Sequence, residues 1–434
     1  MSNPVTFREA LAVWFRIGLL SFGGPAGQIA LMHRIIVDEK KWLDESRFLH
    51  ALNYCMLLPG PEAQQLATYV GWLLHGVKGG VVAGVLFILP GALTIFALSW
   101  LYVSLGDLVA VEGVFFGLKA AVLAIVVQAL IRIGNRALTG TVKPALAVAG
   151  FMALFVFDLP FPLVVLGTGI LGYLVAKWLG CEAGAELPAD VHTATVVRPG
   201  TMRAALACLL LWLLPVAGLM LVLGDGSVFT QLAVFFSKMA TVTFGGAYAV
   251  LAYVGQQGVE NFQWLQAGEM LEGLGLAETT PGPLILVTQF VGFLAAYREA
   301  AAEPSILYAS MGALLTLWVT FVPCFLWIFA GAPYVEKLRG NHSLSAALAA
   351  ITAVVVGVIA NLAVWFAVNA LFAEQHRVAG FGVDMSLPAL SSVDVPMLVL
   401  TALCFILVFG FRFGIFRLLG VSATLGAVWM LWVT

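Results

Sequence analysis

Two positively charged side chains, Arg16 and Lys238, lie within apolar stretches of the sequence, and a helix-breaking motif follows each of them. A cation near the middle of a membrane helix costs about 2.5–3.5 kcal/mol on insertion scales, so each side chain needs a partner. A broken helix frees backbone N–H groups, and the half-helix that follows carries about half a positive charge at its N-terminus. Together these groups predict a binding site for a small tetrahedral anion. The two motifs are Ser21-Phe22-Gly23-Gly24 and Thr243-Phe244-Gly245-Gly246.

A second pair of helix-breaking motifs follows further along the chain. They are Pro59-Gly60-Pro61 and Pro281-Gly282-Pro283, and Thr280 precedes the second of them. One constant offset in residue number relates the two motifs of each pair and also the two cations, which indicates an internal duplication. A single broken helix is better explained by a kink that lets helices pack closely. Because both breaks recur, we expect the four half-helix N-termini to converge on one substrate site.

Two carboxylates lie next to the Pro-Gly-Pro motifs, one in each repeat. Glu62 directly follows the first motif, and Glu278 precedes the second. A carboxyl group that is buried in a protein can take up a proton, so both residues are candidates for coupling transport to a proton gradient. For Glu62 the alternative is an acidic residue that stabilises the N-terminus of the helix it begins.

The other polar candidates also have structural alternatives. Arg16 lies only eight residues after Arg8, so its side chain could extend to the lipid headgroups. This is less easy for Lys238, because the ten residues before it are nearly all apolar. The hydroxyl groups of Ser21 and Thr243 could donate to backbone carbonyls of a broken helix instead of to a substrate.

The composition identifies the environment in which these residues act. Of the 434 residues, 62% are hydrophobic and 10% are charged, whereas a soluble domain has about 25% charged residues. The sequence therefore predicts a polytopic membrane protein in contact with the lipid bilayer. A net charge of −2 argues against nucleic acid as a partner. Five cysteines and six histidines are scattered without ligand spacing, so we expect no metal, no cofactor and no disulfide framework.

The apolar segments predict an all-α fold built from two repeats. Each repeat holds about six apolar segments, and one further segment at 203–223 is left as a linking transmembrane helix. If each repeat crosses the membrane an even number of times, the linking helix inverts the second repeat, as in many secondary transporters. We expect an N-terminal repeat at 1–180, a linker loop and linking helix at 181–227, and a C-terminal, inverted repeat at 228–434.

The distribution of basic residues predicts the orientation. With a cytoplasmic N-terminus, the basic loops at 132–143, 177–203, 337–342 and 412–417 all lie inside, as the positive-inside rule requires. The basic loop at 33–47 violates the rule unless the segments 7–36 and 45–75 are re-entrant hairpins, broken in the middle. Arms of about 12–15 residues are too short to cross a bilayer at 1.5 Å per residue. We therefore expect paired re-entrant hairpins in both repeats.

Longer motifs resemble a known family. The segments "FRIGLLSFGGPAGQIALMHR", "LLPGPEAQQLATYVGWLLHG" and "FILPG" closely resemble the chromate ion transporter family in its long, two-repeat form, and "TFGGAYAVL" and "TTPGP" resemble its second repeat. The resemblance covers nearly the whole chain. The first repeat continues with Gly24-Pro25 and the second with Gly246-Ala247, so the two anion-facing turns need not be identical. The family's characteristic residues match at Arg16, Phe22, Gly23, Gly24, Pro59, Gly60, Pro61, Lys238, Phe244, Gly245, Gly246, Pro281, Gly282 and Pro283.

The resemblance implies a secondary-active transporter, not an enzyme, that exports chromate across a bacterial inner membrane and confers chromate resistance. It implies protons or the membrane potential as the driving force. Chromate and sulfate are both tetrahedral dianions, so a sulfate or general oxyanion carrier is the alternative substrate class. An anion channel, which would need no coupling carboxylate, and a chromate reductase, which would need a redox cofactor, are alternatives of other classes. The sequence leaves open whether the protein is a monomer or a homodimer.

Overall fold

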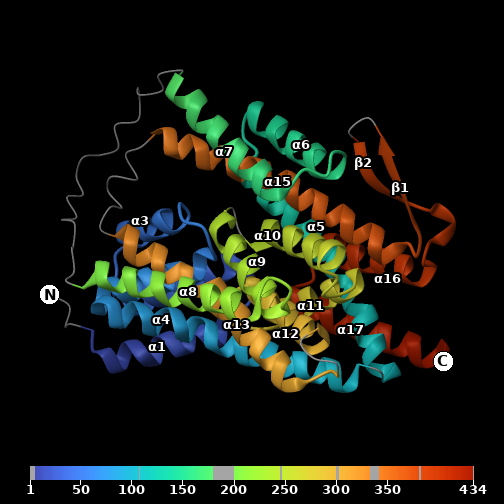
Figure 1. Cartoon of the computed structure of the whole chain (residues 1–434), viewed down its shortest axis with the longest axis horizontal. Coiled ribbons are helices and arrows are strands. Elements are labelled where there is room, and N and C mark those ends of the chain that lie inside the picture. Colours follow the sequence, from blue (N-terminus) through green and yellow to red (C-terminus); the bar gives the residue numbers. More distant parts are fainter. Residues whose placement is uncertain are drawn as a thin grey trace.

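The computed structural model describes residues 5–106, 108–178, 200–244, 247–299, 303–332, 342–380 and 383–433. Helices follow one another along almost all of these residues (Figure 1). The first repeat contains α1 (Phe7–Leu20), α2 (Gly24–His33), the π-helix η1 (Arg34–Glu39), α3 (Glu45–Cys55), α4 (Glu62–Leu105), α5 (Val109–Ala137), α6 (Val142–Phe155) and α7 (Phe161–Trp178). The linking helix is α8 (Thr201–Leu223).

The second repeat follows the same order with one insertion. It contains α9 (Val228–Val242), α10 (Ala247–Gln256), η2 (Gln257–Asn261), α11 (Ala267–Thr279), η3 (Leu284–Leu286), α12 (Val287–Glu299), α13 (Ile306–Gly331), α15 (His342–Leu371), β1 (Gln375–Gly380), β2 (Val383–Pro388), η5 (Leu390–Ser392), α16 (Val395–Phe405), η6 (Ile406–Gly410) and α17 (Ile415–Val433).

Seven helices among the described residues are long and apolar enough to cross a membrane. Their outer faces carry large exposed apolar side chains such as Leu221 and Trp432, which are 87% and 79% exposed. An apolar surface of this extent is stable where lipid surrounds it. The prediction of an all-α polytopic membrane protein is therefore confirmed.

One element was not expected from the sequence. The polar insert at 373–394 forms an antiparallel hairpin of β1 and β2, in which Gln375 pairs with Pro388 and Gly380 pairs with Val383. The hairpin projects at the end of the molecule that also holds the C-terminus (Figure 1).

The internal duplication is visible in the backbone geometry. Lys41 and Gln263, which correspond to each other through the offset between the repeats, both adopt the left-handed conformation, with φ of 53° and 54°. The π-helices η1 and η2 occupy corresponding positions just before these residues. Ser21 Oγ and Thr243 Oγ1 each donate a 2.6 Å hydrogen bond to the carbonyl oxygen four residues earlier. The same local sequence has thus produced the same turn twice.

The first broken segment is a hairpin of α1 against α2 and η1. At the end of η1, Lys40 Nζ lies 2.9 Å from Glu9 Oε1 in the first turn of α1. The chain therefore returns to the end of the molecule from which α1 starts. The tip of this hairpin is the break at 21–23.

The second broken segment, α3 and the start of α4, is also a hairpin. Helix α4 is interrupted at His75-Gly76, where Gly76 has a φ of +66°, and the two parts pack so closely that Gly71 and Gly79 touch. The part at 62–74 therefore runs antiparallel to the part at 77–105. His75 Nε2 lies 2.9 Å from the carbonyl oxygen of Val5, so this turn lies beside the start of α1. The first repeat therefore contains two broken hairpins, and their re-entry into the membrane stays a prediction.

The long part of α4 shows that the two repeats are inverted. It starts beside Val5, at the outer end of the first repeat's hairpins. Near its middle, Gly91 packs directly on the carbonyl of Pro281, at the tip of the α11–α12 hairpin. Near its end, Tyr102 Oη donates a 2.7 Å hydrogen bond to Glu272 Oε2, close to the outer start of α11. The hairpins of the two repeats therefore enter from opposite ends and meet tip to tip.

Two backbone hydrogen bonds join the tips. Gly60 N donates to the carbonyl of Thr243 and Gly282 N donates to the carbonyl of Ser21, each at 2.8 Å. The offset between the repeats exchanges one bond for the other, so the two bonds are related by the pseudo-symmetry of the repeats. Gly60 and Gly282 adopt φ of +127° and +95°, which only glycine tolerates without strain.

The last two long helices of each repeat also pack against a helix of the other repeat. Helix α5 packs on α16 and α17, while α15 packs on α6 and α7. Small residues allow the close approach: Gly113 touches Gly426 on α17, and Gly357 of α15 touches Ala147 on α6. Each repeat therefore completes the packing of the other.

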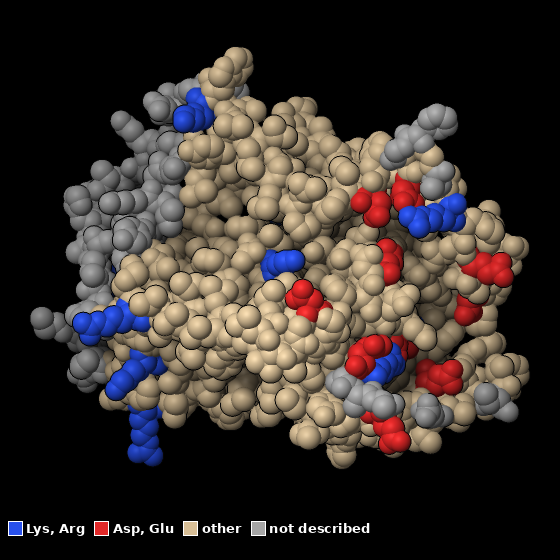
Figure 2. All heavy atoms as spheres, viewed as in Figure 1, with Lys and Arg blue, Asp and Glu red and all other residues tan. Residues whose placement is uncertain are grey.

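Charged residues divide between the two ends of the molecule. Lys and Arg gather over the end from which α8 starts, which we call the basic end (Figure 2). Asp and Glu gather over the end with β1 and β2, which we call the acidic end (Figure 2). The loop at 33–47 lies at the basic end because Lys40 contacts Glu9. The hairpin thereby removes the conflict that this loop posed to the positive-inside rule.

Candidate functional site

A cavity of about 520 Å³ lies where the hairpin tips meet α5 and α15. Its lining includes the first tip, at Gly23, Gly24 and Pro25, and Phe244 from the tip of the second repeat's first hairpin. From the tips the cavity extends toward the basic end, where His33 at the end of α2 lines it. We call it the inner cavity.

The N-terminus of α2 opens into the inner cavity. Gly23 and Gly24 have φ of +86° and +71°, and no side chain caps the helix that starts there. A Cβ atom at either glycine would meet nothing within 4 Å, so the turn faces open space. The backbone N–H groups of the first turn, with the positive end of the helix dipole, can therefore bind an anion in the cavity.

Two arginines contribute positive charge from α5. Gln128, Arg132 and Arg136 are four residues apart on one face of this helix, and all three line the cavity. In the described part of the chain, no carboxylate lies within ion-pair distance of either guanidinium. A guanidinium donates two parallel hydrogen bonds to the oxygens of an oxyanion, so this pair is suited to a tetrahedral dianion.

These two arginines were missed as site residues from the sequence. We expected the loop at 132–143, which contains both, to be a cytoplasmic loop identified only by its charge. The spacing of Gln128, Arg132 and Arg136 at successive helical turns, at the end of an apolar segment, was the signal that marks them.

Both predicted coupling carboxylates line the same cavity. Glu62 is the first residue of α4, and Glu278 lies in the last turn of α11 with 5% of its surface exposed. Tyr248 Oη donates a 2.5 Å hydrogen bond to Glu278 Oε1. Arg132 is close enough to interact electrostatically with both Tyr248 and Glu278. The fold has therefore brought two carboxyl groups and two guanidinium groups from three helices to one place.

The predicted hydroxyl residues and the Pro-Gly-Pro motifs lie at the tips but outside the lining of the inner cavity. Ser21 and Thr243 donate to helix carbonyls, and Thr280 Oγ1 likewise donates to the carbonyl of Ala277 at 3.0 Å. Gly60 and Gly282 form the bonds between the tips. Their neighbours Pro59, Pro61, Pro281 and Pro283 flank these contacts, and Pro59 lines a separate apolar pocket.

Arg16 and Lys238, the two cations in apolar stretches of the sequence, lie outside the cavity. Arg16 has 52% of its side chain exposed and pairs with Glu39 at 3.3 Å. Lys238 is exposed on α9. Phe22 packs edge-on against Phe416, with ring centroids 5.2 Å apart. Anion binding by Arg16 and Lys238 stays a prediction, and the predicted residues Gly245 and Gly246 lie outside the described residues.

Comparisons with known proteins agree with this architecture. The family described as "Chromate transporter" matches residues 8–173 and 230–427, one match in each repeat. The chain is 33% identical over 365 residues to a chromate transport protein of Pseudomonas aeruginosa, covering 82% of this chain and 80% of that protein. It is 29% identical over 354 residues to a chromate transport protein of Cupriavidus metallidurans, covering 82% and 81%. No solved structure matches the chain.

Proposed function

The chain belongs to the chromate transporter family, and on this premise we propose that it is a secondary-active transporter that exports chromate from the cytoplasm and confers chromate resistance. The observation that carries the proposal is the inner cavity, where two guanidinium groups without carboxylate partners among the described residues face an open helix N-terminus and two glutamates. The chromate transport proteins at 29% and 33% identity support the choice of substrate.

The site would bind the anion through its oxygens. Arg132 and Arg136 supply the charge, and the first turn of α2, which lines the same cavity, supplies backbone donors. A charge-assisted hydrogen bond contributes about 1.5–3 kcal/mol, so one such bond from each arginine gives a dissociation constant from roughly tens of micromolar to several millimolar. These groups recognise an oxyanion by charge and geometry. They contact features that chromate shares with sulfate, so a general oxyanion carrier is the alternative substrate class.

Glu62 and Glu278 would couple the movement of the anion to protons. When an oxyanion enters beside Arg132, its negative charge disfavours the ionised form of a neighbouring carboxyl group, so anion binding promotes proton uptake. Tyr248 holds the Glu278 carboxyl in place through its hydrogen bond. A proton taken up with the dianion leaves the cytoplasm with it, so the driving force is the membrane potential, negative inside, which drives the remaining net negative charge outward.

We assign the protein to a bacterial inner membrane with its N-terminus in the cytoplasm. The basic end, which holds the start of α1, then faces the cytoplasm in accordance with the positive-inside rule (Figure 2). In this orientation the inner cavity opens toward the compartment from which chromate is removed.

Chromate uptake into everted vesicles tests the proposal, because their outer surface is the cytoplasmic face. We expect Arg132→Gln and Arg136→Gln each to raise the half-saturating chromate concentration by roughly 10- to 150-fold, the equivalent of one charged hydrogen bond. Arg132→Lys keeps the charge but loses the two-pronged geometry, and it should lie between wild type and Arg132→Gln.

Arg47→Gln is the matched control, because Arg47 is an exposed arginine at the basic end that pairs with Asp44, three residues away. Wild-type half-saturation in both cavity variants would refute the site. Uptake that is never saturable would favour a channel, and equal competition by sulfate would favour the general oxyanion carrier.

A further inference from the structure

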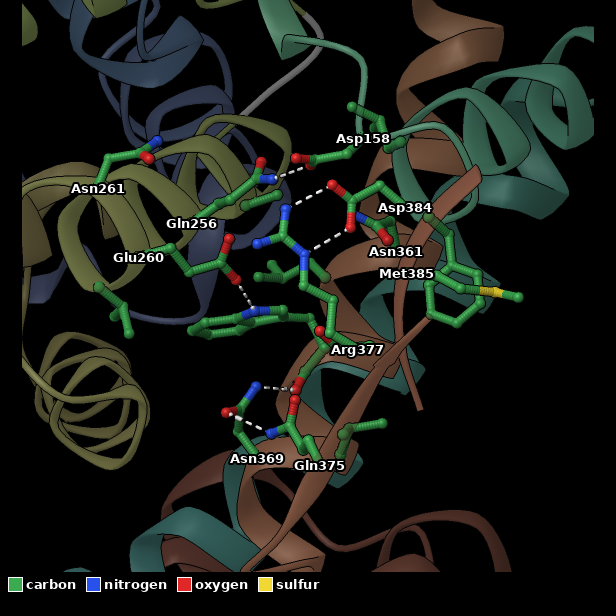
Figure 3. Close-up of a pocket in the computed structure, with 18 residues that line it drawn as sticks. Asp158, Gln256, Glu260, Asn261, Asn361, Asn369, Gln375, Arg377, Asp384 and Met385 are labelled. Carbon is green, nitrogen blue, oxygen red and sulfur yellow. Dashed lines mark hydrogen bonds and ion pairs between the residues drawn. The ribbon is translucent and has the colours of Figure 1, made fainter. Parts of the chain in front are cut away.

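A second cavity, of about 440 Å³, lies at the acidic end of the molecule. It is enclosed by the loop after α6, by α10 and η2, by α15 and by the β-hairpin (Figure 3). We call it the outer cavity. It was not expected from the sequence, and the proposed function does not use it.

The outer cavity is the pseudo-symmetric counterpart of the inner one. After the longer loop at 297–305 the offset between the repeats is larger, and it relates Pro90 of α4 to Pro323 of α13. The same offset carries the inner residues Gln128, Arg132 and Arg136 to Asn361, Trp365 and Asn369 on α15. All three of these residues line the outer cavity. The duplication has therefore produced two chambers, and the two arginines are present in only one of them.

The two cavities share their walls. On α10, Tyr248 lines the inner cavity, whereas Ala252 and Gln256, four and eight residues later on the same helical face, line the outer one. On α15, Thr352 lines the inner cavity and Asn361 the outer one. The two positions are nine residue steps apart, which is about 13 Å of helix.

Between Thr352 and Asn361 helix α15 carries a buried apolar layer. It consists of side chains such as Val355, Val358 and Ile359, each 0% exposed. The two chambers are therefore separated by a thin hydrophobic septum, and their shared helices run from one chamber to the other.

The lining of the outer cavity is net acidic, whereas two arginines and two glutamates balance each other in the inner one. Asp158, Glu260 and Asp384 line the outer cavity, against the single cation Arg377 among the described lining residues. Arg377 is already paired in a two-pronged ion pair with Asp384, at 2.5 and 2.7 Å (Figure 3). Gln256 and Trp365 are engaged with the other two acids, through hydrogen bonds of 2.6 Å to Asp158 and 2.8 Å to Glu260.

We propose that the outer cavity is a release chamber for the same tetrahedral oxyanion, which it binds weakly through neutral donors and expels by the negative charge of its walls. The donors are amides: Asn361, and the second N–H of Asn369 and Gln375, whose amide groups already donate to the carbonyl of Trp365 at 2.8 Å and to Asn369 Oδ1 at 3.0 Å. The inference rests on the proposed function and adds to it the property that makes transport directional. A dianion is attracted by arginines on the cytoplasmic side of the septum and repelled by carboxylates beyond it.

The β-hairpin forms the outer wall of this chamber. It occurs in the second repeat, and Asp384 N donates a 2.8 Å hydrogen bond to the carbonyl of Val156 in the first repeat. The hairpin thereby supplies both Arg377 and Asp384 and fixes them over the loop that carries Asp158. The hairpin lines the outer cavity and not the inner one, which is why the linings of the two cavities differ although the repeats are related.

Protection of a cysteine at position 386 tests the inference. Ser386 lines the outer cavity, and Ser386→Cys is nearly isosteric. In a background with the native cysteines changed to alanine, right-side-out vesicles are treated with a membrane-impermeant thiol reagent in the presence of increasing sulfate. We expect sulfate to protect Ser386→Cys only weakly, and the additional change Glu260→Gln to lower the protecting concentration about tenfold, since one repulsive carboxylate is removed.

Glu303→Gln is the control, because Glu303 is an exposed acid that does not line the cavity and lies near Ser305, whose N–H donates to the carbonyl of Tyr297 beside the Arg298–Glu269 pair of the acidic end. Equal protection in the Glu260→Gln and Glu303→Gln backgrounds would overturn the inference. So would strong protection of Ser386→Cys when Glu260 is unchanged. Chromate uptake by the same proteins in everted vesicles separates the two proposals. Loss of uptake in the starting background would count against the proposed function. Normal uptake together with no effect of Glu260→Gln on protection would contradict the release chamber alone.

Discussion

Substituting Gly60 with alanine tests whether the contact between the hairpin tips holds the two repeats together. The φ of Gly60 is +127°, and its N–H donates to the carbonyl of Thr243 at 2.8 Å. A Cβ atom at this position would lie 2.7 Å from Gln65 Nε2 and 3.0 Å from Cys324 Sγ. Backbone strain of this kind costs about 1–3 kcal/mol and overpacking costs about 1–3 kcal/mol. We therefore expect Gly60→Ala to lower the free energy of unfolding by about 2–6 kcal/mol.

Two further glycines separate the contributions of strain and contact. Gly23 also has a positive φ, but a Cβ there meets nothing within 4 Å, so Gly23→Ala introduces strain alone. Gly91 lies within α4, and a Cβ there would overlap the carbonyl of Pro281, so Gly91→Ala introduces a clash alone. Thermal unfolding of the detergent-purified proteins, followed by tryptophan fluorescence, gives the order of stability.

We expect Gly60→Ala and Gly91→Ala to unfold at lower temperature than Gly23→Ala, and to lose chromate uptake with it. If Gly60→Ala unfolds at the wild-type temperature, the tip contact does not stabilise the fold. The reasoning from the hydrogen bond between Gly60 and Thr243 would then be wrong.

Three further outcomes follow from the site and its surroundings. Arg16→Gln and Lys238→Gln test the predicted anion binding by these two cations in everted vesicles: abolished chromate uptake with normal membrane insertion would support it, whereas retained uptake, which their exposed positions outside the inner cavity favour, would exclude it. Glu62→Gln or Glu278→Gln should still exchange labelled chromate but lose the response of uptake to an imposed pH gradient, and an unchanged response in both would exclude these carboxylates as the coupling groups. Burial raises the pKa of the Glu260 carboxyl, so this group becomes neutral at a higher pH than an ordinary glutamate does. Lowering the external pH should therefore strengthen the inhibition of export by external sulfate. The same pH profile in Glu260→Gln would contradict this.

The breaks and the duplication could be predicted because they are written in local sequence. Glycine and proline at Gly23-Gly24-Pro25 end a helix wherever they occur, and a common offset shows that two distant segments fold alike. The inversion could be predicted because an odd linking helix leaves few alternatives. The carboxylates Glu62 and Glu278 were found because each stands beside such a break.

The inner arginines could not be identified in this way, because their role depends on contacts between elements far apart in sequence. Arg132 faces the cavity only because α5 packs against helices of the other repeat. Arg16 lies in an apolar stretch, yet its side chain emerges on an exposed face beside Glu39. The β-hairpin at 375–388 lacked a turn signal strong enough to separate it from an ordinary polar loop.

The packing of helices across the two repeats has a consequence for the synthesis of the protein. Helix α5 is complete once residue 137 has been added, whereas α17, which covers it, begins only at residue 415. At 5–20 residues per second, the small-residue face of α5 waits about 15–60 s for its partner. During that interval the insertion machinery or lipid must cover Gly113 and Gly117, and a chain released before α17 is made leaves its first half unfinished.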